Sequence, residues 1–341
     1  MSKSLSRSTH LRALSSLRPR IQRVSLNSKE QVKPVALRER SVHSTGVLLG
    51  VTGYLFWGLF PLFFVLLDSV SPIEIVAHRI IWSLIVVILV LIIGKQWRAF
   101  TAAFSRRNIM ILGFAAIFLS INWLVYVYAV STNQVVQASL GYFVNPLISV
   151  AMGVIILKER LRLTQWVAVG IALIAVVVLT IASGSVPWIA LTLGMSFGTY
   201  GLLKKFANLP ALHSLGIETA VLFPVALIIL GIAVANGTES FVLDGSKITF
   251  LLIMLGPVTA IPLLAFGGAS TRIPLSTLGI LQYITPISQF ILGVFVFEEA
   301  MSTGRWIGFT LVWASIIIFT VDMYRHAKTR TRQLQETLLE P

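Results

Sequence analysis

Long apolar runs separated by short polar segments make up most of the chain after Ser44. About 20 helical residues cross a hydrocarbon core of about 30 Å, so runs of this length predict membrane-spanning helices. The runs that fit one helix each are 46–67, 73–93, 211–234, 248–270, 274–297 and 304–323.

Two longer stretches each need a turn. Residues 108–157 carry no charge, and as a single helix they would extend about 75 Å, more than twice the thickness of the core. The polar segment 131–134 is the expected turn. Residues 163–203 must likewise hold two helices, joined at the Gly- and Pro-containing segment 183–187. The pattern therefore predicts ten membrane-spanning helices.

Composition supports this prediction. Hydrophobic residues make up 56% of the chain and charged residues 12%, whereas soluble proteins carry about 25% charged residues. Mean hydropathy is +0.87. A chain this apolar cannot cover its surface with polar groups in water, which predicts an all-α integral membrane protein with the lipid bilayer as its solvent.

The net charge of +14 follows membrane topology. With the N-terminus in the cytoplasm, 24 of the 27 Lys and Arg residues fall in cytoplasmic tails and loops. Outer loops hold only Lys247 and Arg305, and Arg79 lies within a span. This asymmetry predicts that both termini are cytoplasmic. It also argues against a nucleic-acid partner, because the basic residues are dispersed between apolar runs.

The two ends are expected to be cytoplasmic tails, residues 1–44 and 324–341. The first tail is basic, predicted to be disordered, and holds only two acids, Glu30 and Glu39. It has no apolar run of the secretory-signal type, but its Arg- and Ser-rich composition leaves an organelle transit peptide as an alternative.

Several kinds of chemistry are not expected. The chain has no cysteine, which excludes disulfides and thiolate metal sites. Its five histidines are not paired at metal-ligand spacing on one helix. Phosphate-binding Gly-Lys loops and Gly-x-Ser-x-Gly elbows do not occur in the sequence. We therefore expect no cofactor, no metal and no catalytic residue.

A weak internal repeat has an offset of 140 residues. It aligns Pro146 with Pro286, Gly153 with Gly293, Glu159 with Glu299 and Trp166 with Trp306. The repeats would be residues 45–182 and 183–323, each with five helices. Because five is odd, the second repeat is inverted in the membrane, an arrangement that underlies alternating access in transporters. The alternative is a gene duplication that serves packing alone.

Several short motifs resemble those of one transporter family. They are residues 140–147 (LGYFVNPL), 78–83 (HRIIWS), 122–124 (NWL) and 276–279 (STLG), with Gln282 and Tyr283. The sequence from about 46 to 323 resembles the RarD-type EamA transporters of the drug/metabolite transporter superfamily. The resemblance implies ten helices in two EamA repeats, a bacterial inner membrane, and export or exchange of small metabolites. It names no substrate.

Polar residues inside the spans are the candidate functional residues, because they are costly in a bilayer. Asn145 precedes Pro146, which frees a backbone carbonyl one turn earlier, and Gln282 and Tyr283 precede the equivalent Pro286. The candidates for a substrate cavity are Asn122, Trp123, Tyr142, Asn145, Gln282 and Tyr283. Helix-to-helix packing is the alternative role for these residues.

Ionisable residues in the spans are candidates for coupling and gating. His78 and Arg79 lie in the second span, and Glu218 occupies the repeat position of His78. Histidine titrates near neutral pH when unperturbed, so protons are a candidate coupling ion. The alternatives are a structural contact for each group and, for Arg79, a side chain that extends to the membrane interface.

The function indicated is a secondary transporter of small metabolites or drug-like solutes that works by alternating access. Two other classes remain open: a membrane-embedded enzyme, and a scaffold or sensor subunit. The enzyme is disfavoured because Glu159 and Glu299 fall at opposite membrane faces. The sequence does not indicate an oligomeric state.

Overall fold

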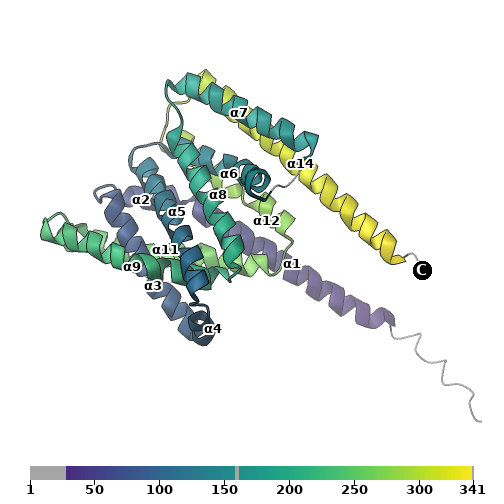
Figure 1. Ribbon diagram of the computed structural model, residues 1–341, viewed down its shortest axis with the longest axis horizontal. Coiled ribbons are helices and arrows are strands. Elements are labelled where there is room, and N and C mark those ends of the chain that lie inside the picture. Colours follow the sequence, from purple (N-terminus) through teal and green to yellow (C-terminus); the bar gives the residue numbers. More distant parts are fainter. Residues whose placement is uncertain (1–27, 158–160, 340–341) are drawn as a thin grey trace, which may run out of the picture. The chain divides into compact units, whose positions relative to one another are not determined.

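The computed structural model describes residues 28–157 and 161–339, and every regular element within these ranges is helical (Figure 1). The chain divides into two compact units, residues 1–45 and 46–341. The described part of the first unit is the beginning of helix α1 (Ser28–Gly58). The second unit holds all the later elements.

The first half of the second unit contains six further helices and one short 3-10 turn. Helix α1 is followed, after a bend of 42°, by a short helical pair. The elements are α2 (Phe60–Phe64), η1 (Val65–Leu67), α3 (Pro72–Ile93), α4 (Trp97–Ala102), α5 (Arg106–Ser131), α6 (Val135–Leu157) and α7 (Leu163–Ser183).

The second half follows a similar order, with one span divided into three parts. That span is α12, α13 and the π-helical turn η2. The elements are α8 (Trp188–Ala207), α9 (Ala211–Ala235), α10 (Ser240–Leu243), α11 (Ser246–Ser270), α12 (Leu275–Leu281), α13 (Ile284–Ile291), η2 (Leu292–Val296) and α14 (Thr303–Leu339).

Within the described residues, seven helical segments are long and apolar enough to cross a membrane, and the bent pair of α1 and α2 with η1 makes an eighth. Helices α6 and α8 are 23 and 20 residues long. Both predicted turns are present, because α5 ends at Ser131 before α6, and α7 ends at Ser183 before α8.

Local sequence explains where these helices begin and end. Ser71 caps α3, its hydroxyl accepting a hydrogen bond from the backbone N–H of Glu74, and Pro72 occupies the first helical position. Helix α7 ends at Ser183, and the next residue, Gly184, has a φ of +67°, in the left-handed region that glycine adopts most readily. The capping at Ser71 fixes the start of α3, the helix that carries His78 and Arg79.

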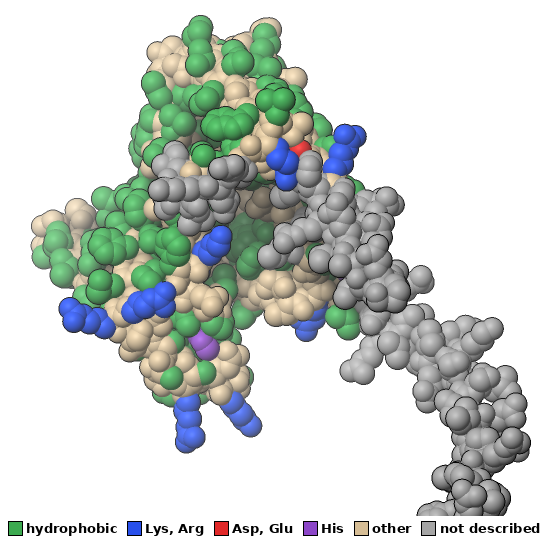
Figure 2. Space-filling model, turned by 45° about the vertical axis from the view of Figure 1, so that its right-hand side comes forward, with side chains coloured by type: hydrophobic (Ala, Val, Ile, Leu, Met, Phe, Trp, Pro, Cys, Tyr) green, Lys and Arg blue, Asp and Glu red, His purple; other side chains and the backbone are tan. Residues whose placement is uncertain are grey.

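The helices pack in a few extended pairs. Helix α7 runs beside α14 (Figure 1), α5 and α6 both pack against α8, α3 packs against α9 and α11, and α13 packs against α6. Many large apolar side chains point outward, including Leu163, Ile93 and Ile181. Figure 2 shows hydrophobic side chains over much of one face, as expected for a surface in contact with lipid.

Candidate functional site

Arg79 of α3 is buried against three other helices, α2, α5 and α11. Only 4% of its surface is exposed, and its Nε atom donates a hydrogen bond to the hydroxyl of Thr259 in α11 at 3.0 Å. Its guanidinium carbon lies 4.0 Å from the centre of the Trp123 ring in α5. Rings from α2 flank it at 5.5 Å and 5.7 Å. The side chain therefore points into the protein.

The environment of Arg79 stabilises a cation only in part. An arginine near the centre of a membrane helix costs about 2.5–3.5 kcal/mol on insertion scales, and a desolvated cation–π contact returns about 2 kcal/mol. Arg79 forms no ion pair with any described residue. A positive charge thus remains uncompensated beside an aromatic wall.

A line of hydrogen bonds runs through the neighbouring helices. Asn122 donates from its amide to the carbonyl of Leu193 and to the hydroxyl of Ser196, both at 3.1 Å. The Tyr142 hydroxyl donates to the Asn122 amide oxygen at 3.1 Å, and the ring of Tyr142 contacts that of Tyr126 at 5.9 Å. Helices α5, α6 and α8 are therefore joined by polar contacts beside Arg79.

Gln289 extends this line to α13 and α1. Its amide nitrogen lies 3.2 Å from the Tyr126 hydroxyl and 3.3 Å from the carbonyl of Trp57. The side chain is 2% exposed, and its amide oxygen has no hydrogen-bond partner among the described residues. An unpaired buried acceptor is costly, so it is a position where the N–H or O–H group of a ligand would be stabilised.

Asn145 provides a second unpaired acceptor. It lies directly before Pro146, which interrupts the hydrogen-bond ladder of α6. The Asn145 amide oxygen is buried, and no residue in the described ranges forms a hydrogen bond with it. It faces Gly198 of α8, where an added Cβ atom would lie 3.5 Å from it.

Comparison with known proteins identifies the family. The model of the EamA-like transporter family matches residues 44–181. A protein named RarD from Streptomyces exfoliatus is 47% identical over 300 residues, which cover 88% of this chain and 95% of that protein. The chain is a RarD-type member of the EamA-like transporter family.

Two further comparisons agree with this assignment. An uncharacterized transporter from Vibrio cholerae is 38% identical, and the match covers 84% of this chain and 96% of that protein. A solved crystal structure shares the fold with a TM-score of 0.55 at 20% identity, covering 82% of this chain and 98% of the other. This RarD-type chain is therefore a multi-pass membrane protein of a transporter family, with relatives in bacteria.

One of the predicted cavity residues, Tyr283, belongs to a different hydrophobic cluster from Trp123 and Tyr142. The ring of Tyr283 lines an apolar groove of about 480 Å³ together with Phe143 and Trp313. Gln282, its neighbour, is half-buried. The structure thus brings Asn122, Trp123 and Tyr142 together beside Arg79 and separates Tyr283 from them.

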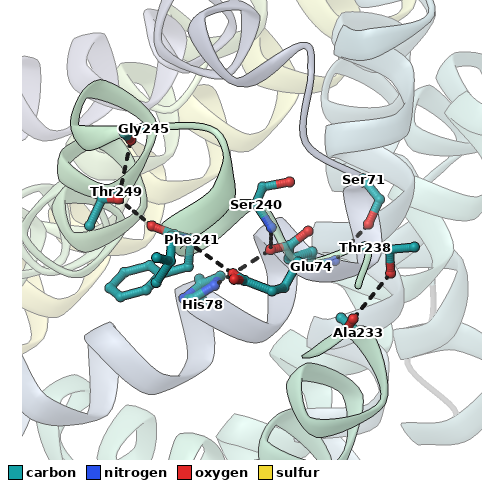
Figure 3. A network of polar contacts seen from close by, with 11 residues as sticks. Ser71, Glu74, His78, Ala233, Thr238, Ser240, Phe241, Gly245 and Thr249 are labelled. Carbon is teal, nitrogen blue, oxygen red and sulfur yellow. Dashed lines mark hydrogen bonds and ion pairs between the residues drawn. The ribbon is translucent and has the colours of Figure 1, made fainter. Parts of the chain in front are cut away.

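His78 belongs to a contact between α3 and the short helix α10. Figure 3 shows its ring stacked on Phe241, with the ring centres 4.9 Å apart. Glu74 accepts a hydrogen bond from the backbone N–H of Ser240 at 2.7 Å. Its carboxylate lies 3.9 Å from Nε2 of His78, beyond hydrogen-bond reach. These contacts fasten α10 to the start of α3.

Glu218 is fully buried and has two partners. Its carboxylate lies 3.2 Å from the Lys204 ammonium and accepts a hydrogen bond from the Tyr200 hydroxyl at 3.1 Å. Lys204 also donates to Tyr200 at 2.7 Å. This group of three joins the end of α8 to the beginning of α9.

Sequence reasoning missed three members of the central site, Tyr126, Thr259 and Gln289. A signal for Gln289 existed, because it lies seven residues after Gln282, two turns along one face of an apolar span. Thr259 and Tyr126 carried no such signal. A single hydroxyl in a membrane helix most often bonds its own backbone or a neighbouring helix.

Proposed function

We propose that this chain is a secondary transporter that moves small metabolites or drug-like solutes by alternating access. It would cross the membrane ten times, in two inverted repeats of five helices, residues 45–182 and 183–323. The tails at 1–44 and 324–341 would both lie in the cytoplasm. In this assignment α6 and α8 add to the eight apolar spans.

The observation that carries the proposal is a pair of close contacts related by the offset of 140. An added Cβ atom at Gly58 would meet Ser288 at 2.6 Å and the carbonyl of Thr285 at 3.3 Å. At Gly198, the repeat position of Gly58, the neighbours beyond Met152 are Ile148 and Asn145, the repeat positions of Ser288 and Thr285. The same interhelical contact therefore occurs twice, with the repeats exchanged.

The packing of whole helices follows the same rule. Under the offset, α3 corresponds to α9, α5 to α11, α6 to α12 with α13, and α7 to α14. The contact of α3 with α11 then corresponds to that of α9 with α5, and both are present. In the contacting pairs α3–α9, α6–α13 and α7–α14, the two helices are repeat partners of each other, so exchanging the repeats leaves each contact unchanged. Inverted bundles that exchange conformations in this way can open a central site to either side in turn.

The central site would be the polar line beside Arg79. It draws residues from both repeats, such as Asn122 from the first and Gln289 from the second. A site at the repeat interface is where this class of transporter binds solute. His78 and Glu218, at one repeat register, would tune the exchange between states, with protons as the candidate coupling ion.

The test is solute flux through the purified protein. Proteoliposomes would be screened by counterflow with labelled small metabolites and drug-like compounds, chosen from those that raise the melting temperature in detergent. We expect counterflow of at least one stabilising compound. A scaffold or sensor subunit would instead bind a partner protein and move no solute, and a membrane-embedded enzyme would convert a compound without moving it.

A further inference from the structure

Arg79 is a buried cation without a counter-ion in the described part of the chain. A guanidinium has five N–H groups; the Nε–H group donates to Thr259, and none of the other four pairs with a described carboxylate. The three buried acids that the structure describes are engaged elsewhere: Glu74 with Ser240, Glu218 with Lys204, and Asp322 with Arg162. None of them is available to pair with Arg79.

The surroundings of Arg79 are aromatic and hydrogen-bonding. Trp123 covers the guanidinium at 4.0 Å, and Tyr126, which contacts Tyr142, also contacts Phe64, one of the rings that flank the cation. Gln289, bonded to Tyr126, keeps an unpaired amide oxygen. The groups around the cation therefore offer a flat apolar wall and neutral polar atoms.

We propose that Arg79 binds the carboxylate of an organic monoanion that has an aromatic or apolar body, an inference that rests on the proposed transport function. The planar fork of a guanidinium matches a carboxylate with two parallel hydrogen bonds. Trp123 would flank the ion pair, and the body of the ligand would lie against Tyr126 and Tyr142.

Charge balance favours a monoanion over a phosphate ester. Arg79 contributes one positive charge, and Lys204, in the last turn of α8, is already paired with Glu218. A doubly charged phosphate would leave one uncompensated negative charge at membrane depth, which is strongly unfavourable. A carboxylate leaves the site neutral.

The experiment compares three probes with the same phenylpropyl frame and different head groups: hydrocinnamate, hydrocinnamamide and phenylpropylamine. Binding to detergent-purified protein would be measured by thermal shift and calorimetry. We expect wild type to bind hydrocinnamate at least about tenfold more tightly than the amide or the amine, as for a charge-assisted hydrogen-bonded pair. A fourth probe, phenyl phosphate, lacks the propyl chain and carries the doubly charged head group, and it should bind more weakly than hydrocinnamate.

Three variants sharpen the test. Arg79→Gln should abolish the preference for the carboxylate. Arg79→Lys, which keeps the charge but not the fork, should keep the order of the probes and weaken hydrocinnamate binding by about tenfold. The control is Arg272→Gln, an exposed arginine in a loop, which should bind all probes as wild type does. If Arg79→Gln does not fold, the test rests on the order of probe affinities in wild type and on the affinities measured for Arg79→Lys.

Two results overturn the anion site: wild type that binds the amide or amine as tightly as hydrocinnamate, and wild type that binds none of the three. Counterflow separates this failure from that of the proposed function. Movement of the amine or amide without the carboxylate would contradict the anion site and leave transport standing. Tight binding of hydrocinnamate without movement of any solute would support the site and contradict transport.

Discussion

Gly58 in α1 lies so close to Ser288 in α13 that a Cβ atom added to the glycine would stand 2.6 Å from the Ser288 Cβ atom. Such a distance requires the helices to separate. The neighbour is a Cβ atom next to the backbone, so a rotamer change cannot relieve it. The contact also joins the two proposed repeats, so it bears on both stability and motion.

We predict that Gly58→Ala lowers the free energy of unfolding by about 1–3 kcal/mol, the usual cost of overpacking. Gly198→Ala should cost less, because its nearest neighbour at 2.7 Å is the flexible end of Met152. The matched control is Gly201→Ala, since nothing lies within 4 Å of that position. Melting curves in detergent test the order, and a Gly58→Ala variant as stable as Gly201→Ala would contradict it.

The sequence predicts that Asn145 and Tyr283 both line the cavity, and the structure gives them different neighbours. Asn145 has an unpaired amide oxygen facing α8, whereas Tyr283 lines an apolar groove with Phe143 and Trp313. We therefore expect Asn145→Ala to weaken binding of a stabilising solute by several-fold. Tyr283→Phe should weaken it less, because it keeps the ring. Calorimetry on folded protein measures both, and the reverse order would assign the cavity to the Tyr283 side.

Glu299 should make stability depend on pH. It lies between the last two apolar spans, and its carboxylate accepts hydrogen bonds from the backbone N–H of Val136 at 3.1 Å and 3.2 Å. Burial raises the pKa of Glu299 to about 7, against the opposing effects of the backbone N–H groups of Val136 and Val135 and of Arg305. The folded chain thus holds a proton at pH values where the unfolded chain has lost it.

The direction in which stability changes with pH follows from the linkage between proton binding and folding. The stabilising contribution of protonated Glu299 is complete below about pH 4.5 and is lost as the pH rises through about 7. The melting temperature of wild type should fall from about pH 5 to about pH 8 more steeply than that of Glu299→Gln. Glu298→Gln, which changes the exposed neighbour, should follow wild type. Parallel curves for wild type and Glu299→Gln would rule out the titration.

The share of the structure that could be predicted from the sequence differs between the membrane spans and the candidate site. Charge-free runs and membrane thickness predicted the turns after Ser131 and Ser183, because length and hydropathy are local properties. The π-helical turn and the short helices α4 and α10 were not predicted, since they depend on tertiary contacts such as that of Glu74 with Ser240.

In the candidate site, too, some residues could be predicted from the sequence and others could not. Arg79 and Asn122 stood out because charged and amide groups are rare in apolar helices. Their partners did not, because Thr259 is 180 residues from Arg79 and Gln289 is 163 residues from Tyr126. No periodicity within one helix predicts which faces of distant helices meet.

His78 and Glu218 test whether protons drive transport. They share one repeat register, but their contacts differ: His78 stacks on Phe241, and Glu218 pairs with Lys204. We predict that wild type in proteoliposomes accumulates a known substrate in response to a pH gradient. His78→Gln or Glu218→Gln should lose this response and keep exchange. Wild-type flux that is indifferent to the gradient would exclude proton coupling.

The most direct measurement of the central claim is the accessibility of single cysteines, which the cysteine-free chain allows without background. Lys95→Cys and Asp244→Cys, at exposed positions in two different loops, are the topology controls. Asn145→Cys reports on the central site. An impermeant thiol reagent would be added to intact cells and to inside-out vesicles.

The account predicts that Asp244→Cys reacts only from outside and Lys95→Cys only from inside, while Asn145→Cys reacts from both sides. A stabilising solute should protect Asn145→Cys on either side. Labelling of Asn145→Cys from one side only, or from neither with the controls reacting as expected, would contradict alternating access.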